Sequence, residues 1–292
     1  MIYCISHSRD LDGYSSGAIV KMAMSEKNSE CVSIGYDYGQ PFPYDKITPG
    51  KPIVMIDVSL PMEEMEKVAA YSNYAFTWID HHISAINDYN DYIRHQEKFL
   101  TAVLDNSKAA CEIAWGYYFP DRGLPEAIEL LGKYDTWREN DTEYWQTDIL
   151  PFQYGMRLKC NSPETFPYNV LKDHSYVRDI IAEGKIILSY QRQVDKAACR
   201  GSFELKFKGY SVIAMNGGGF SSNAFASVYD EAKHDIMMPF KYDGKKWVFS
   251  LYTTKDIDCS AIAKEFGGGG HYRAAGMTLT QEQALAILNN LS

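Results

Sequence analysis

The chain has 292 residues, of which 46% are hydrophobic and 23% are charged. These proportions exclude a disordered chain and a small disulfide-stapled scaffold, and the length predicts about two domains. No apolar run approaches the ~18 residues of a membrane helix, and the first residues do not have the pattern of a signal peptide. The six cysteines include no CxxC pair. This argues against zinc ribbons and redox sites and favours reduced thiols in a cytoplasmic protein.

Charge is distributed unevenly along the chain. Residues 1–170 carry a net charge of −11, whereas residues 171–292 carry +2. A protein that coats duplex nucleic acid is basic throughout, so this class is disfavoured. The acidic part could bind cations, although acidic surfaces more often serve solubility.

Short apolar runs alternate with helical patterns in the first half. Strands are predicted at Ile2–Ser6, Cys31–Tyr36, Ile53–Asp57 and Tyr74–Ile79. Helices are predicted at Tyr14–Ser25, Pro61–Tyr71, Lys108–Phe119 and Pro125–Asp135. This alternation predicts an α/β domain with a doubly wound, mostly parallel sheet. Residues 140–170 are rich in Pro, Asn and aromatic residues and show no period, so an irregular crossing segment is predicted there.

The pattern changes after a long predicted helix at Ser175–Ala198, which we interpret as a connector. Strands are then predicted at Phe203–Phe207, Tyr210–Met215, Ile236–Tyr242 and Trp247–Tyr252. Asp243-Gly244 predicts a hairpin between the last two strands, and helices are predicted at Ser260–Phe266 and Gln281–Leu291. We therefore expect an N-terminal domain over residues 1–174, a helical connector over 175–200, and a smaller C-terminal α/β domain with a mixed sheet over 201–292.

Acidic and histidine side chains gather where the predicted strands and one helix of the first domain end. In chain order they are His7, Asp10, Asp12, Asp57, Asp80, His81, His82 and Asp135. Taken singly, each could be a turn residue or a helix cap. The carboxyl ends of parallel strands converge on one edge of a sheet, however, and clustered carboxylates need cations to neutralise them. The set predicts a metal site, and its carboxylate-rich ligands favour Mn²⁺ or Mg²⁺ over zinc.

The second domain contains the run FGGGGHYRAAG, residues 266–276. Four successive glycines are entropically costly, and they suit a backbone that must approach another group closely. We expect their bare N–H groups to form an anion nest, with His271 and Arg273 as additional donors. A flexible linker is the alternative, but the run leads directly into an apolar AAGMTL strand. The segment therefore predicts phosphate binding.

Five motifs in this order, HSRDLDG, IVMID, IDHHIS, KYDTW and GGGGHYRAAG, resemble those of the DHH phosphoesterase superfamily. The resemblance covers about residues 2–280. It is closest to members that carry a DHH-associated domain with a GGGH motif, which include nano-RNases, pAp phosphatases and the larger RecJ-type exonucleases. Family II inorganic pyrophosphatases share the N-terminal motifs but have no GGGH run, so pyrophosphate is a disfavoured substrate.

The resemblance implies a role for each motif residue. His7, Asp10 and Asp57 would hold one Mn²⁺, and Asp12, Asp57, His81 and Asp135 the other, so that Asp57 bridges the two. His82 would contact phosphate, and Asp80 would orient His81 or its neighbour. Substrate would be held by Gly268, Gly269, Gly270 and His271, assisted by Arg273. The chain departs from the family at Tyr252, where many relatives carry an arginine, and in the variable loop between His7 and Asp10.

The expected activity is hydrolysis of phosphoester bonds in short single-stranded oligonucleotides or nucleotides by two Mn²⁺ or Mg²⁺ ions. An exopolyphosphatase-like hydrolase and a non-catalytic nucleotide sensor are the alternatives. The choice of RNA or DNA and the oligomeric state, a homodimer among the options, are left open by the sequence. Four aromatic residues could stack on a base or simply pack in the core: Tyr14, Trp137, Tyr252 and Tyr272.

Overall fold

The computed structural model describes residues 1–94 and 100–290. The chain divides into two compact units, one spanning Met1–Leu188 and the second beginning at Ser189, inside the long helix α7 (His174–Ala198). Each unit has its own sheet and its own hydrophobic core. None of the helices in the described residues combines the length and the apolar character needed to span a bilayer.

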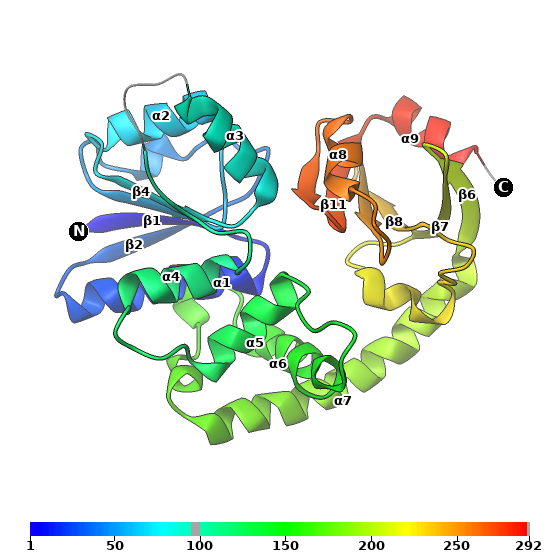
Figure 1. The fold of residues 1–292 in the computed structure, drawn as a ribbon, viewed down its shortest axis with the longest axis horizontal. Helices are drawn as coiled ribbons and strands as arrows, with labels where there is room; N and C mark the ends of the chain where they lie inside the picture. Colours follow the sequence, from blue (N-terminus) through cyan, green and yellow to red (C-terminus); the bar gives the residue numbers. More distant parts are fainter. Residues whose placement is uncertain (95–99, 291–292) are drawn as a thin grey trace. The chain divides into compact units, whose positions relative to one another are not determined.

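Within the described residues, the first unit contains a five-stranded sheet in the order β2-β1-β3-β4-β5, and all neighbouring strands are parallel. β1, β2 and β4 of this sheet are labelled in Figure 1. The strands are β1 (Ile2–His7), β2 (Cys31–Tyr36), β3 (Ile53–Ile56), β4 (Phe76–Asp80) and β5 (Thr101–Leu104). β3 is buried along its whole length, which explains its uninterrupted apolar sequence. The register pairs His7 with Tyr36 and Ser6 with Ile56, so these strands finish at one edge.

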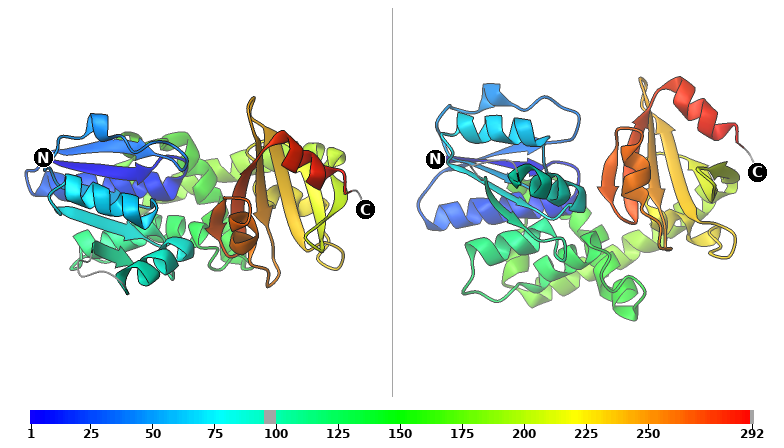
Figure 2. Two further views of the ribbon diagram at one scale, coloured as in Figure 1. Left: turned by 90° about the horizontal axis from the view of Figure 1, so that it is seen from above. Right: turned by 45° about the horizontal axis from the view of Figure 1, so that its top comes forward.

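Helices cover both faces of this sheet (Figures 1 and 2). α1 (Leu11–Glu26) and α4 (Ala110–Tyr118) pack on one face, and α2 (Met62–Tyr71) and α3 (Ile83–Ile93) pack on the other. The core on the α1 side continues into α5 (Glu126–Asp135), α6 (Leu150–Lys159) and the first part of α7. The predicted α/β class with a parallel N-terminal sheet is confirmed.

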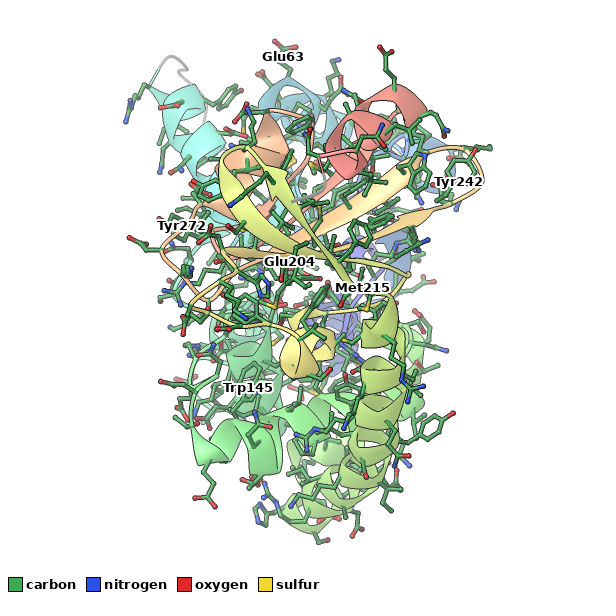
Figure 3. All side chains as sticks on the ribbon, turned by 90° about the vertical axis from the view of Figure 1, so that its right-hand side faces the viewer. Glu63, Trp145, Glu204, Met215, Tyr242 and Tyr272 are labelled. Atoms are coloured by element: carbon green, nitrogen blue, oxygen red, sulfur yellow. The ribbon has the colours of Figure 1, made fainter. Side chains whose placement is uncertain are left out.

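The prediction of an irregular segment over residues 140–170 is wrong, because α6 and a preceding π-helical turn (Trp145–Ile149) occupy much of it. Trp145 is buried among the helices of the first unit (Figure 3). All of the residues from Leu150 to Met156 are buried, and a helix that is buried all round has no amphipathic period to detect. α3 and β5 were also not predicted.

The second unit has a mixed sheet in the order β10-β11-β9-β8-β7-β6, in which only β7 and β8 pair in parallel among the described residues. Its strands are β6 (Phe203–Phe207), β7 (Tyr210–Asn216), β8 (Ile236–Tyr242), β9 (Trp247–Tyr252), β10 (Gly269–His271) and β11 (Ala274–Leu279). The short helices α8 (Cys259–Lys264) and α9 (Gln281–Leu288) pack against its core. The predicted mixed sheet is confirmed, whereas the predicted end of the last helix at Leu291 lies outside the described residues.

The predicted hairpin turn lies between β8 and β9, next to Tyr242 (Figure 3). Oδ1 of Asp243 accepts hydrogen bonds from the backbone N–H groups of Lys245 and Lys246, both at 2.8 Å. Gly244 adopts a φ of 101°, which only glycine reaches without strain.

Candidate metal centre

Three strands of the first unit deliver site residues to the carboxyl edge of the sheet. His7 is the last residue of β1, Asp57 directly follows β3, and Asp80 ends β4 with His81 and His82 behind it. Parallel strands place these ends side by side, as expected for a ligand site in an open α/β sheet.

Local backbone geometry brings the remaining ligand candidates to the same edge. Asp10 caps the N-terminus of α1, since its Oδ1 accepts a hydrogen bond from the backbone N–H of Gly13 at 2.9 Å. A Cβ at Gly13 would collide with the carbonyl oxygen of His7, so glycine is required where α1 passes the end of β1. Asp57 adopts a left-handed φ of 59°, an unfavourable conformation for this residue that is typical of functional sites.

His7, Asp10 and Asp57 form one group. Nδ1 of His7 lies 2.9 Å from Oδ2 of Asp10 and 3.6 Å from Oδ2 of Asp57. The N-cap and ligand interpretations of Asp10 are compatible, because one of its oxygens caps α1 while the other faces His7.

His81, Asp12, Asp57 and Asp135 form a second group. Nε2 of His81 lies 3.3 Å from Oδ1 of Asp57, 3.4 Å from Oδ2 of Asp135 and 3.6 Å from Oδ2 of Asp12. Asp57 therefore faces both groups, with one oxygen toward His7 and the other toward His81.

The N-terminus of α4 holds Asp12. Its two carboxylate oxygens accept hydrogen bonds from the backbone N–H groups of Ala110 (2.9 Å) and Cys111 (2.8 Å). Exposed N–H groups and the helix dipole both favour a negative charge at this position. The arrangement keeps Asp12 oriented although it is buried.

Glu112 braces this helix end. Its Oε2 accepts a hydrogen bond from the N–H of Ala109 at 2.9 Å and also pairs with Arg138, three residues after Asp135. One buried carboxylate thus connects the helix end that holds Asp12 with the segment that follows Asp135.

Asp80 is the most enclosed acid of the site. Its Oδ1 lies 2.7 Å from Nδ1 of His82 and accepts the N–H of His81, and its Oδ2 accepts the indole N–H of Trp78 at 3.2 Å. Of the two orientations that the sequence left open for Asp80, this contact supports the one in which it orients the ring of the neighbour, His82.

The electrostatics of the cluster reflect its crowding. Burial raises the pKa of Asp135 to about 6, and burial together with the charges of Asp57 and Asp135 raises that of Asp12. Burial lowers the pKa of His81, but the surrounding carboxylates outweigh it and raise the value above the ordinary one. The crowded carboxylates therefore favour a positive charge within the cluster.

The donor set fits divalent cations. Oδ2 of Asp57 and Oδ2 of Asp135 are buried and have no hydrogen-bond partner among the described residues. Such orphaned carboxylate oxygens are costly unless a cation binds them. Three combinations in the first unit have ligand atoms close enough for one ion: His7–Asp10–Asp57, Asp12–His81–Asp135 and Asp57–Asp80–His81–His82. Oxygen-rich ligands with imidazole suit Mn²⁺ or Mg²⁺.

Asp37 also lies at this edge, although the sequence predictions did not include it. It directly follows β2, and its Oδ1 lies 3.7 Å from Nε2 of His7 while its Oδ2 accepts a hydrogen bond from Nε of Arg9 at 2.5 Å. An acid directly after a strand is the same signal that identified Asp57, and it would have found Asp37 as well.

Two of the four glycines in the run of the second unit lack the bare N–H groups that we expected. Gly267 and Gly268 follow α8 and cap its C-terminus. Their N–H groups donate hydrogen bonds to the carbonyls of Lys264 (3.0 Å) and Ala263 (2.9 Å), so these two donors are not bare. Gly269 to His271 form the edge strand β10 beside β11. A Cβ at Gly268 would collide with the backbone of β11, whereas one at Gly269 would meet nothing within 4 Å. Packing within the second unit thus explains why position 268 needs a glycine, but it does not explain the glycine at position 269.

The side chains next to this run are accessible. Gly270 has a φ of 142° and lies close to the carbonyl of Ala274, while His271 is half-buried and Arg273 is exposed. The hydroxyl of Tyr272 donates a hydrogen bond to Asp256 at 3.1 Å.

The other three stacking candidates are held by the folds of their own units. The hydroxyl of Tyr14 donates to the carbonyl of Ser8 at 3.0 Å, and both Tyr14 and Trp137 pack against the core of the first unit. Tyr252 is part of β9 and packs in the second unit.

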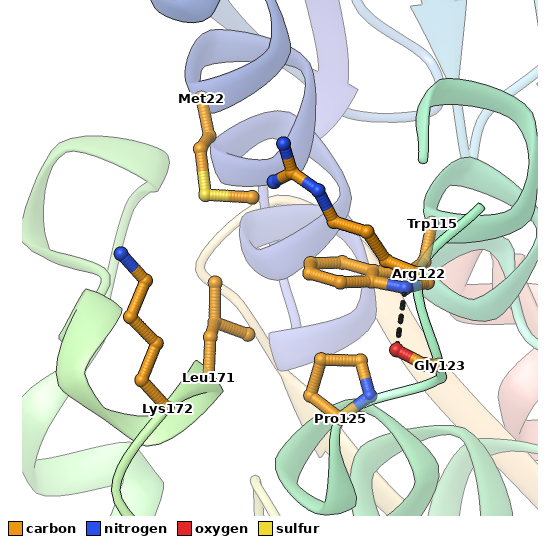
Figure 4. Close-up of a pocket in the computed structure, with 7 residues that line it drawn as sticks. All are labelled: Met22, Trp115, Arg122, Gly123, Pro125, Leu171 and Lys172. Carbon is orange, nitrogen blue, oxygen red and sulfur yellow. Dashed lines mark hydrogen bonds between the residues drawn. The ribbon is translucent and has the colours of Figure 1, made fainter. Parts of the chain in front are cut away.

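A pocket of about 240 Å³ lies elsewhere on the first unit, lined by Met22, Trp115, Arg122, Gly123, Pro125, Leu171 and Lys172 (Figure 4). Met22 is about 15 Å along α1 from Asp12. Arg122 already binds both carboxylate oxygens of Glu26, at 2.7 and 2.9 Å. The pocket therefore contains none of the predicted site residues, and its arginine is neutralised.

A family model of the DHHA1 domain matches residues 209–291, the region of the mixed sheet and the glycine run. Oligoribonuclease NrnB of Bacillus subtilis is 24% identical over 302 aligned residues, covering 97% of this chain and 74% of that protein. The chain therefore carries a DHHA1 domain and is similar to members of the DHH phosphoesterase superfamily. It is also 25% identical over 244 residues to protein R106 of Acanthamoeba polyphaga mimivirus, which covers 81% of the chain. The match spans only 55% of R106, little more than half of that relative.

Solved structures share the fold of this chain. The pGpG-specific phosphodiesterase PggH of Vibrio cholerae aligns with a TM-score of 0.52 at 12% identity, over 99% of this chain and 97% of that one. RecJ of Thermus thermophilus in complex with Mn²⁺ aligns with a TM-score of 0.54 at 12% identity. The alignment covers 99% of this chain and 51% of RecJ.

Proposed function

We propose that the protein is a metal-dependent phosphoesterase of the DHH type that hydrolyses short oligonucleotides or nucleotides with two divalent cations, Mn²⁺ foremost. The observation that carries the proposal is the position of Asp57, whose two oxygens face two separate groups of ligand candidates. A shared carboxylate of this kind would hold two metal ions close together, as two-metal phosphoesterases require. The Mn²⁺ in the related RecJ structure supports the choice of metal.

The ligands of one ion would be His7, Asp10 and Asp57, and those of the other Asp12, Asp57, His81 and Asp135. When bound, two such cations lower the pKa of water and polarise phosphoryl oxygens. The chain's own contribution is orientation. The N-terminus of α4 holds Asp12, and Asp80 holds the ring of His82 by its Nδ1. We assign to His82 the role of donating a hydrogen bond to a phosphoryl oxygen as charge develops there.

Substrate binding is assigned to Gly268, Gly269, Gly270 and His271, with Arg273 as an additional cation. Gly269 supports this assignment best, because neither backbone strain nor close packing in the second unit requires a glycine there. A net charge of only +2 over residues 171–292 suits a substrate with few phosphates better than a long backbone. The names of NrnB, an oligoribonuclease, and PggH, a pGpG phosphodiesterase, agree with a substrate of about two to five nucleotides.

Hydrolysis assays with Mn²⁺ test the proposed reaction. The panel consists of a labelled dinucleotide, a 24-mer, pAp, linear polyphosphate and a cyclic dinucleotide. We expect the dinucleotide to be the best substrate, with mononucleotides as products. Preferential release of phosphate from polyphosphate would contradict the substrate assignment, and no turnover of any member would contradict the activity.

Asp57→Asn tests the shared ligand. The variant should lose metal and about 100-fold or more in turnover, because an amide cannot neutralise two cations. Asp91→Asn is the matched control, since Asp91 lies exposed on α3 and pairs only with Arg94 among its described ion-pair partners. Full turnover by Asp57→Asn would refute the metal assignment.

A further inference from the structure

The segment that follows β2 lies beside the candidate metal site, at the same edge of the sheet. Because β2 lies beside β1, Asp37 comes within 3.7 Å of His7 and binds Nε of Arg9 at 2.5 Å. The Arg9 side chain is 67% exposed, and its two Nη groups make no hydrogen bond within the described residues. An exposed Arg–Asp pair contributes little to folding, so Arg9 is not explained by stability.

Tyr38 lies next to both site histidines. Its ring centroid is 5.8 Å from that of His7 and 6.4 Å from that of His82, edge-on in each case. The side chain is 49% exposed, although its hydroxyl end lies beside Ser59 in the segment after β3. A large aromatic ring is thus left open to solvent at the metal site.

The loop that carries Tyr38 is well braced. The N–H of Tyr38 donates to Oδ1 of Asp37 at 2.9 Å, and the buried Tyr36 donates its hydroxyl to the carbonyl of Gln40 at 2.8 Å. Gly39 supplies the left-handed φ of 82° that closes the loop. A ring held in place before binding loses little entropy when a ligand stacks on it.

We infer that Tyr38 and Arg9 form a nucleotide-binding subsite beside the metal centre, where a nucleobase stacks on Tyr38 and a phosphate of the substrate binds Arg9. The inference rests on the proposed phosphoesterase function and specifies the substrate as one that carries a base. Aromatic stacking binds any base, because every base has a π-face, whereas the two Nη groups of a guanidinium suit the oxygens of a phosphate. The subsite therefore predicts recognition of nucleotides without base specificity.

Steady-state kinetics of Tyr38→Leu test the subsite with two Mn²⁺-supported substrates, a dinucleotide and its analogue without the base next to the scissile bond. The ratio of kcat/KM for the dinucleotide to kcat/KM for the analogue should fall about 5- to 150-fold. Most of this change should come from a higher KM for the dinucleotide. Tyr117→Leu is the matched control, because Tyr117 is 45% exposed on α4. Loss of Mn²⁺, or equal loss on both substrates, would overturn the inference and make Tyr38 a support for the histidines.

A binding measurement separates this inference from the proposed function. A dinucleotide that carries 2-aminopurine should lose fluorescence when it stacks on the wild-type protein, and Tyr38→Leu should abolish that quenching while Tyr38→Phe restores it. Arg9→Gln should weaken binding of the dinucleotide and of its abasic analogue alike, because both keep the phosphate. Quenching without hydrolysis would refute the phosphoesterase but keep the subsite. Hydrolysis without Tyr38-dependent quenching would refute the subsite alone.

Discussion

Replacing Glu112 by glutamine tests whether one buried carboxylate supports the metal centre from a distance. Glu112 accepts the N–H of Ala109 and pairs with Arg138, so it connects the end of α4 with the segment after Asp135. A Cβ at Gly132 would collide with this carboxylate, which shows that α5 packs directly on it. Glutamine keeps the shape but removes the charge and presents an NH₂ group to other donors.

The expected loss of stability follows from these contacts. Loss of one charge-assisted hydrogen bond costs about 1.5–3 kcal/mol. For the first unit, Met1–Leu188, that corresponds to a melting temperature lower by about 3–12 °C. Because the end of α4 holds Asp12, Mn²⁺ affinity should also fall about 10-fold, as for other residues that orient metal ligands.

The assay combines thermal melts of the metal-free protein with Mn²⁺ titrations. Glu129→Gln is the matched control, since Glu129 makes a partly exposed pair with Lys133 on the outer side of α5 and should change stability by less than about 1 kcal/mol. If Glu112→Gln melts at a lower temperature but binds Mn²⁺ as the wild type does, Glu112 stabilises the fold without supporting the metal site. If it matches Glu129→Gln in both measurements, the reasoning is refuted.

Four further outcomes are expected. Gly268→Ala should destabilise the protein by about 1–3 kcal/mol through its clash with β11, whereas Gly269→Ala should leave the melting temperature unchanged and raise KM; equal destabilisation would contradict this. His82→Ala should keep its Mn²⁺ but turn over about 100- to 1000-fold more slowly, and elemental analysis showing metal loss would make it a ligand. Burial raises the pKa of Asp148, but hydrogen bonds from a neighbouring hydroxyl and from Arg178 outweigh it and lower the pKa. This pair therefore stabilises the fold above about pH 4 and less as the pH falls below that. Arg178→Met should cost about 1–3 kcal/mol in urea unfolding at pH 7 and clearly less at pH 3, and an equal cost at both would argue against the pair. Turnover should fall as the oligonucleotide lengthens and depend weakly on salt, which faster, processive degradation of a 24-mer would contradict.

The strands of the first unit were predictable because the hydrophobic pattern of each strand reflects how it is buried. β3 is an uninterrupted apolar run that is buried on both faces, and β2 has the predicted bounds Cys31–Tyr36. Once a parallel sheet is inferred, the edge at which Asp57 and Asp80 lie follows from topology alone. The types of residue at the site and their approximate location were therefore available from the chain itself.

Elements without a local signal were missed. α6 is buried along most of its length and so shows no amphipathic period, and β5 has only the four residues Thr101–Leu104. Asp37 had the correct signal, an acid directly after a strand, but it stands in a DYGQP stretch that also matches a turn.

The sequence alone determined the α/β class, the order of most strands along the chain and most of the acids and histidines at strand ends, because these depend on short-range patterns of hydrophobicity. Only the tertiary structure decided which groups meet. Asp12 is held by the end of a helix that begins 98 residues later, and Asp80 binds the ring of His82. In the glycine run, contact with β11 separates Gly268, which folding requires, from Gly269, which it does not. Such pairings join distant segments through packing, and packing is a property of the whole fold that no local pattern of residues contains.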